Sequence, residues 1–308
     1  MRCIGIEIGG TKLQSAVVGA DGTVCATRLA AVDPAAGAAG ILAALSRQLA
    51  EFVSGPDGAA VEAVGIGFGG PVDRGRGTIA TSHHVAGWDG FPLAEWIGVR
   101  CGGLPVWLEN DTNAAALAEA VCGAGRGLRT VVYSNAGSGI GGGLVIAGEL
   151  YHGRVPGEME LGHLRVGAGS ATLEDVASGW AIDRQVAAAA AANPRGPLAG
   201  ESVAGRPGAR GLAAALAADD AAAAAILDAA ARQYGLALSH VVHLLNPDVI
   251  VLGGGVARIG EPWRDAVARH LDASLMAALR PAPPVRLAAL GDAVVPIGAA
   301  LVAARGRL

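Results

Sequence analysis

The apolar and polar positions of the chain follow two periods, and each period predicts one kind of element. Short runs of alternating or continuous apolar residues predict strands over residues 2–8, 13–18, 23–29, 61–68, 105–108, 249–252 and 285–290, and two more strands within 130–151. Apolar residues three or four positions apart predict helices over 40–52, 92–97, 113–121, 181–192, 211–231, 222–245 (one long helix or two), 260–275 and 297–304. Strands that alternate with helices in this way are typical of an α/β protein.

The opening of the chain is repeated later in the sequence. Residues 2–18 read as a strand, a glycine turn and a second strand, and residues 130–151 follow the same plan. An internal repeat of this kind predicts two similar lobes, each presenting a glycine turn to a cleft between them. Between the second and third strands, Asp21-Gly22 predicts a two-residue type I′ turn.

Composition and charge narrow the class of protein. The chain has 308 residues, of which 52% are hydrophobic and 16% charged, with a formal net charge of −4. This excludes a disordered chain, and the lack of a basic block argues against a nucleic-acid surface. The four cysteines form no C-x-x-C pair, and the sequence contains neither a membrane-spanning apolar run nor an opening signal peptide. We therefore expect a cytoplasmic enzyme with no membrane or nucleic-acid partner.

Three glycine-rich segments are candidates for holding a nucleotide. Residues 9–12, Gly-Gly-Thr-Lys, contain the only lysine of the sequence, and residues 137–143 contain five more closely spaced glycines. Such turns expose main-chain N–H groups that can hold a phosphate, although the first could be an ordinary hairpin and the second a sheet bend. Residues 253–255 end a strand in glycines, and such an edge can accept an adenine or a ribose.

Two polar clusters are candidates for binding and activating a hydroxyl substrate. Asn110 and Asp111 lie where a strand meets a helix, so the carboxylate of Asp111 could cap that helix or accept a proton from a substrate. Glu160 and His163 are three positions apart, and Glu174 follows closely. These three residues could be surface contacts or a cluster that binds a polyol.

These motifs, in this order, resemble the ROK family (repressor, open reading frame, kinase), which includes bacterial glucokinases and N-acylhexosamine kinases. The resemblance covers the chain from Ile4 to about Arg305. It implies the actin-like, hsp70-like (ribonuclease H-like) sugar kinase fold, with two α/β lobes and a cleft between them. The implied small lobe is 1–112 plus the C-terminal helix at 292–308, and the large lobe is 113–291. It also implies a homodimer or homotetramer.

The resemblance further implies a role for individual residues. Asp111 would be the general base, and ATP would bring Mg²⁺ close to Glu7. Nucleotide-binding residues would be Gly9, Gly10, Thr11, Lys12, Gly137, Ser138, Gly139, Gly141, Gly142, Gly254 and Gly255. Sugar-binding residues would be Gly70, His84, Asn110, Asp111, Glu160, His163 and Glu174.

The sequence departs from the family pattern at several positions. Glu7 replaces the common Asp, and Gly69-Gly70-Pro71 replaces Pro-Gly-Pro. His84 stands where the family often has Asn, so we expect glucose to be a poor substrate and a differently arranged polyol to be preferred. The alternative is that His84 points to solvent and that His83 or the main chain contacts the ligand. The cysteine-rich zinc motif is missing between His163 and Glu174, so we expect no structural zinc.

The function implied is an ATP-dependent carbohydrate kinase that transfers the γ-phosphate to a hydroxyl of a hexose or related polyol. One alternative is a sugar-binding regulator or sensor without kinase activity. The family's repressors carry a helix-turn-helix ahead of the kinase-like part, whereas Gly9 and Gly10 fall within the first ten residues here. A kinase that uses polyphosphate, or one that acts on a cyclitol, stays open at this stage.

Overall fold

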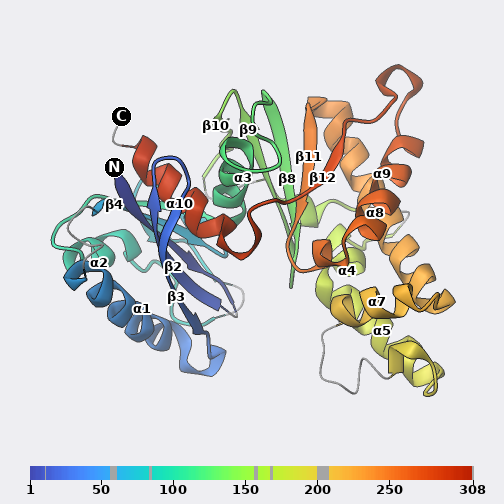
Figure 1. Cartoon of the computed structure of the whole chain (residues 1–308), viewed down its shortest axis with the longest axis horizontal. Helices are drawn as coiled ribbons and strands as arrows, with labels where there is room; N and C mark the ends of the chain where they lie inside the picture. The colour runs from blue at the N-terminus through green and yellow to red at the C-terminus, as the bar shows by residue number, and fades with distance from the viewer. Residues whose placement is uncertain are drawn as a thin grey trace. The chain divides into compact units, whose positions relative to one another are not determined.

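The structure is a computed structural model that describes residues 1–10, 12–55, 61–82, 85–155, 159–166, 169–199 and 208–306 (Figure 1). The chain divides into two compact units. The first contains residues 1–127, 143–159 and 289–308, and the second contains residues 128–142 and 160–288. No helix in the described ranges is long and apolar enough to cross a membrane.

The strands form two five-stranded sheets with the same plan. The first has the order β3-β2-β1-β4-β7, and the second has the order β10-β9-β8-β11-β12. The strand bounds are β1 (Arg2–Ile8), β2 (Lys12–Gly19), β3 (Val24–Ala31), β4 (Val61–Phe68), β7 (Val106–Asn110), β8 (Thr130–Ala136), β9 (Ile140–Ile146), β10 (Glu149–Leu150), β11 (Val249–Gly253) and β12 (Val285–Leu287). β2 is antiparallel to β1 and to β3, and β4 and β7 continue parallel to β1. In the second sheet β9 and β10 are antiparallel, whereas β8, β11 and β12 run parallel. The sequence repeat is therefore a repeat of topology.

Helices cover both faces of the first sheet, because its inner strands β1 and β4 are buried on both faces (Figure 1). α1 (Gly37–Ser54) and α2 (Leu93–Arg100) lie on one face, where Ile4, Ile6 and Ile8 of β1 join a core with Leu45 and Leu49 of α1. On the other face, a second core gathers side chains of α3 (Asp111–Val121) and α10 (Val294–Arg305). The period-two alternation along β1 directs its isoleucines to the first of these cores.

Glycines allow α10 to lie directly on its neighbours. A Cβ added at Gly5, Gly65 or Gly298 would collide with the main chain of Pro296, Ala299 or Ala114, respectively. No larger residue fits at these positions without moving a helix backbone. The close approach explains why α10, although it comes last in the sequence, belongs to the first unit.

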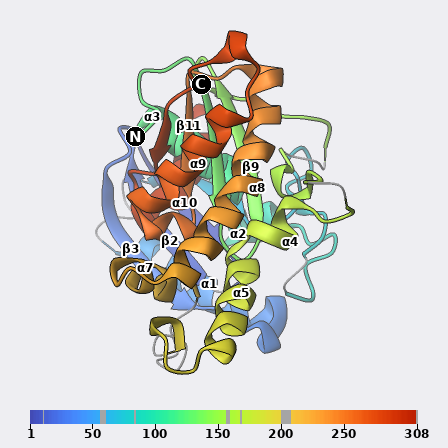
Figure 2. The same cartoon turned by 90° about the vertical axis from the view of Figure 1, so that its right-hand side faces the viewer.

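The second unit places its helices beside β8, β11 and β12. These helices are α4 (Leu173–Ala177), α5 (Gly179–Ala192), α7 (Gly208–Ala217), α8 (Ala221–Leu245) and α9 (Glu261–Ala273). Figure 2 shows α8 and α9 side by side. Tyr234 of α8 packs edge-on against Trp263 of α9 with ring centroids 5.3 Å apart, and its hydroxyl lies 2.6 Å from Ser134 Oγ on β8.

Short elements complete the chain. The strands β5 (Val72–Asp73) and β6 (Thr78–Ile79) form a small hairpin, and single 3₁₀ turns occur at Pro34–Ala36, Leu161–His163, Val256–Ile259, Ala277–Leu279 and Gly291–Ala293. None of the 3₁₀ turns was expected from the sequence, because one turn is too short to show a period.

Two local predictions are wrong. The turn after β2 is not type I′, because Gly22 alone has a positive φ, of 84°, and Gly19 N–H donates to Thr23 O instead. This is the three-residue hairpin loop, which ends in a glycine. The helix expected over 211–231 is interrupted, because Asp220 caps a new helix through its side chain and the N–H of Ala223. The residues expected at 222–245 form one helix and not two.

Candidate active site

The junction between β7 and α3 places two polar side chains at the start of a buried helix. The side-chain oxygen of Asn110 accepts from the N–H groups of Thr112 at 2.9 Å and Asn113 at 3.1 Å, so Asn110 is the N-cap. The alternative that the carboxylate of Asp111 caps this helix is therefore wrong. Asn110 Nδ2 also donates to Gly70 O at 3.4 Å. Because Asn110 caps the helix, the Asp111 carboxylate is not needed as a cap.

Asp111 lies beside two glycine turns of the first unit. A Cβ added at Gly69 would lie 3.2 Å from Asp111 Oδ2, 3.4 Å from Ile8 O and 3.6 Å from the Cα of Gly9. The same carboxylate accepts from Thr112 Oγ1 at 3.2 Å through Oδ1. The space that a side chain at Gly69 would fill is thus bordered by Asp111 and the end of β1.

Glu7 and Lys12 place opposite charges at the first glycine turn. Their side chains pair at 2.7 Å, and Lys12 Nζ also donates to Asp292 O at 3.2 Å. Burial raises the pKa of Glu7 to about 7, while the ion pair with Lys12 opposes this rise and the charge of Asp111 adds to it. Two carboxylates that repel each other beside a glycine turn suit a divalent cation. No group of three or more metal-ligating side chains occurs within the described ranges.

The second glycine turn joins β8 to β9 in the second unit. Gly137 N–H donates to Gly139 O at 2.8 Å, and Gly179 N–H donates to Gly137 O at 2.7 Å. Ser138, at the tip, is exposed. Gly141 N–H, at the start of β9, donates to the side-chain oxygen of Asn135 at 2.8 Å.

Glu174 supports that turn. Its Oε2 accepts from Ile140 N–H at 2.8 Å, and a Cβ added at Gly139 would lie 2.5 Å from the same oxygen. Gly162 also approaches closely, since a Cβ there would lie 3.2 Å from Glu174 Oε2. Glu160 and His163 flank Gly162 on a 3₁₀ turn in which His163 N–H donates to Glu160 O at 3.1 Å, and both side chains are exposed.

The glycines after β11 lie against the end of β8. Gly254 has a φ of 81°, and a Cβ there would lie 2.5 Å from Ala136 O. A side chain at Gly253 would collide with the ring of Tyr133. β8 and β11 are parallel neighbours with Gly253 opposite Asn135, so Gly254 and Gly255 lie next to the turn that begins at Gly137.

The structure therefore gathers the predicted residues into two groups. In the first unit, Gly9, Gly10, Lys12, Gly70, Asn110 and Asp111 share one end of the sheet. In the second unit, the turn beginning at Gly137 is joined by Glu160, His163, Glu174, Gly254 and Gly255, and Gly142 continues into β9. Thr11 and His84 lie outside the described residues.

The sequence reasoning gave no role to Glu109, the residue before Asn110. It is 1% exposed, and its carboxylate bonds to Asn110 N–H, Asn113 and His152. An acidic residue at an otherwise apolar position of a buried strand was the available signal.

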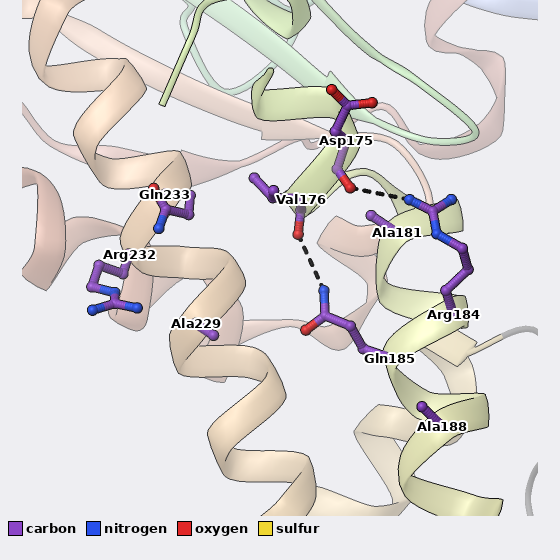
Figure 3. A pocket seen from close by; sticks show the side chains of 9 residues that line it. All are labelled: Asp175, Val176, Ala181, Arg184, Gln185, Ala188, Ala229, Arg232 and Gln233. Carbon is purple, nitrogen blue, oxygen red and sulfur yellow. Dashed lines mark hydrogen bonds between the residues drawn. The ribbon is translucent and has the colours of Figure 1, made fainter. Parts of the chain in front are cut away.

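A cavity of about 400 Å³ lies elsewhere in the second unit, between α4, α5 and α8 (Figure 3). Arg184 and Gln185 of α5 face α4 and donate to the main-chain oxygens of Asp175 and Val176 at 3.0 and 3.2 Å. None of its lining residues is among the glycine turns or polar residues of the two groups. These two hydrogen bonds connect α5 to α4. Because the lining contains none of the predicted site residues, the cavity is not the candidate active site.

Comparison with known proteins defines the class. The sequence profile of the ROK family matches residues 3–305. The chain is 30% identical to a glucokinase of Halalkalibacterium halodurans, over 96% of this chain and 92% of the relative. It is 32% identical to a glucokinase of Streptomyces coelicolor, over 96% of each.

A solved structure agrees with these relatives. It is a ROK family glucokinase from Streptomyces griseus in complex with glucose and AMPPNP, which is 33% identical and superposes with a TM-score of 0.87. The match covers 99% of this chain and 100% of that one. The chain belongs to the ROK family. These comparisons confirm the expected actin-like, ribonuclease H-like fold and the expected class of enzyme, an ATP-dependent sugar kinase.

Proposed function

We propose that this ROK-family kinase transfers the γ-phosphate of ATP to a hydroxyl of a hexose, with Asp111 as general base. The observation that carries the role of Asp111 is its place beside Gly69 and the end of β1, with its helix already capped by Asn110. A carboxylate that lies next to a glycine turn can accept a proton from a substrate hydroxyl bound there.

Residues of this chain would supply the proton acceptor and the phosphate-binding groups that the reaction needs. Asp111 takes the proton as the sugar oxygen attacks the γ-phosphorus, the bond to the bridging oxygen breaks, and ADP leaves with the electron pair. Main-chain N–H groups of the turns at Gly9 and Gly137 would hold the phosphates, and Lys12 would add a positive charge. A magnesium ion bound with the phosphates near Glu7 would neutralise their charge. Most of the acceleration would come from positioning.

The sugar-binding residues form the second part of the proposal. Asn110, held to Gly70 O, would contact sugar hydroxyls, and Glu160, His163 and Glu174 would contribute further polar groups. Glu174 also supports the second glycine turn through Ile140 N–H, so its replacement would affect both the sugar and the phosphates. That His84 disfavours glucose stays a prediction. We further propose that the enzyme acts in the cytoplasm as a homodimer or homotetramer.

The choice of sugar and of phosphate donor is tested together. The purified protein is supplied with ATP or polyphosphate and with a panel of hexoses, amino sugars and cyclitols, and sugar phosphate is measured by mass spectrometry. ATP-dependent phosphorylation of a hexose supports the proposal, and glucose is the first to test because the relatives are glucokinases. Sugar binding without any phosphorylation would support the sensor alternative instead.

A further inference from the structure

A buried carboxylate precedes the proposed base on the same stretch of chain. Glu109 is the penultimate residue of β7, two positions before Asp111, and is 1% exposed. Burial by itself would raise the pKa of Glu109, but hydrogen bonds from His152 and Asn113 and the charge of His152 hold that pKa below its ordinary value. Glu109 is therefore an ionised group inside the first unit.

Each oxygen of Glu109 is occupied. Oε1 accepts from Asn110 N–H at 2.9 Å and from Asn113 Nδ2 at 3.0 Å. Oε2 accepts from His152 Nε2 at 2.7 Å, since an ionised carboxylate can only accept. The guanidinium of Arg74, in the β5–β6 hairpin, lies 3.6 Å from Oε1. The carboxylate thus joins three separate segments of the first unit.

A buried ionised carboxylate adds little to the net stability of a core. Replacing a buried ionic group by apolar side chains of similar volume is often neutral or stabilising. Two bonds of Glu109 go to the N–H of Asn110 and to the side chain of Asn113, in the first turn of α3. These bonds therefore act on the main chain and the first helical turn around Asn110 and Asp111.

We propose that Glu109 is a positioning residue for phosphoryl transfer, with His152 and Arg74 compensating its charge. It sets the main chain at Asn110 so that the sugar contact and the base are presented together. This inference rests on the proposed function of Asp111 and Asn110. It assigns no substrate contact to Glu109 itself.

The first test is the isosteric substitution Glu109→Gln. The amide oxygen can still accept from Asn110 N–H and Asn113, but the amide nitrogen then faces His152, and the charge that compensates Arg74 is lost. We expect kcat to fall about 10-fold to 100-fold and the KM for the sugar to rise, because small misplacements of reacting groups cost this much. The KM for ATP should stay at the wild-type value.

A double variant tests whether the pair acts as a unit. His152→Leu removes the same interaction from the other side, because leucine has no hydrogen-bonding group, and leaves the buried carboxylate with Arg74, so we expect a smaller loss of the same kind. If the two residues act through one contact, Glu109→Gln combined with His152→Leu should lose no more than Glu109→Gln alone. Should Glu109→Gln fail to fold, His152→Leu carries the test, because the imidazole that it replaces is only partly buried.

The matched control is Glu119→Gln at the other end of α3. Glu119 is also a buried carboxylate, and it accepts from the N–H groups of Ala124 at 2.7 Å and of Ala289 and Leu290 at 2.9 Å. These bonds hold loops and not the start of α3. We expect Glu119→Gln to lower the melting temperature while leaving the KM for the sugar unchanged.

The measurements are kcat and the two KM values for each variant, the sugar affinity of the ATP-free protein by calorimetry, and the melting temperature. A wild type that phosphorylates no sugar would contradict the proposed function. An active wild type whose Glu109→Gln variant keeps its kcat and sugar KM would overturn the inference alone. So would losses of activity that follow the melting temperature equally in the Glu109 and Glu119 variants.

Discussion

Glu7→Gln is expected to make the protein more stable against unfolding than the wild type, and the gain should depend on pH. Burial raises the pKa of Glu7 to about 7 in the folded protein, against an ordinary value of 4.5. Below about pH 4.5 the carboxyl is protonated in both the folded and the unfolded chain and costs nothing. As the pH rises through 7 the folded protein must carry the buried charge, so its stability falls across this window.

The size of the effect follows from the two pKa values. A gap of about 2.5 pKa units corresponds to about 3 kcal/mol at alkaline pH, of which most appears between pH 5 and pH 8. Glutamine cannot ionise, so the variant escapes this loss. Lys12 loses its charged partner in the variant, so the gain is taken from the difference between the two pH values and not from either value alone.

The assay is thermal unfolding of the wild type, Glu7→Gln and the control Glu7→Asp, which keeps a buried carboxylate. The difference in melting temperature between Glu7→Gln and the wild type should be larger at pH 8 than at pH 5 by roughly 5 °C. Glu7→Asp should follow the wild type. An equal difference at both pH values, or a larger one at pH 5, would refute the reasoning about burial.

Three further outcomes are expected. Glu119→Gln should lower the free energy of unfolding in urea by about 1–3 kcal/mol, because the amide nitrogen cannot accept from the N–H of Ala124 as the carboxylate Oε2 does; a change below about 0.5 kcal/mol would contradict this. Elemental analysis of protein purified without added metal should find no zinc, since no cysteine lies between His163 and Glu174; about one zinc per chain would show that other ligands complete a site. His84→Asn should raise kcat/KM for glucose relative to other sugars, and an unchanged preference would remove His84 from substrate choice.

The elements were predictable where one period runs unbroken. The isoleucines at 4, 6 and 8 alternate along β1, and the leucines at 45 and 49 repeat along α1, so both elements lie where the sequence indicated. The internal repeat likewise predicted two sheets of one plan. Such patterns can be seen in the sequence because a strand or helix that packs on a core buries one face, and its apolar residues then repeat with the period of that element.

The misplaced boundaries have local causes. At 218–220 the alanine-rich sequence does not indicate where α7 ends and α8 begins, because alanine favours a helix on both sides. The start of α8 is defined by the Asp220 cap. At the β7–α3 junction, Asn110 and Asp111 are both residue types that favour the N-cap position. Which of them caps α3 depends on the residue at which β7 ends. Sequence alone does not decide that.

The residues that support the candidate active site were harder to predict from the sequence than its glycines. Glu109 is adjacent to the predicted Asn110 and Asp111, yet its partner His152 is 43 residues away along the chain. Arg74 comes from a hairpin of two-residue strands that shows no period. A buried ion pair joins residues that only the folded chain brings together, so the sequence does not show which residues pair with Glu109.

The decisive measurement compares sugar phosphorylation by the wild type and by Asp111→Asn. ADP release and sugar phosphate are both followed with ATP and the best sugar of the panel, while nucleotide binding and the melting temperature confirm an intact fold. The general-base assignment predicts that kcat falls about 10²-fold to 10⁴-fold with nucleotide affinity retained. Turnover within a few-fold of the wild type would contradict it and would remove Asp111 from the chemistry.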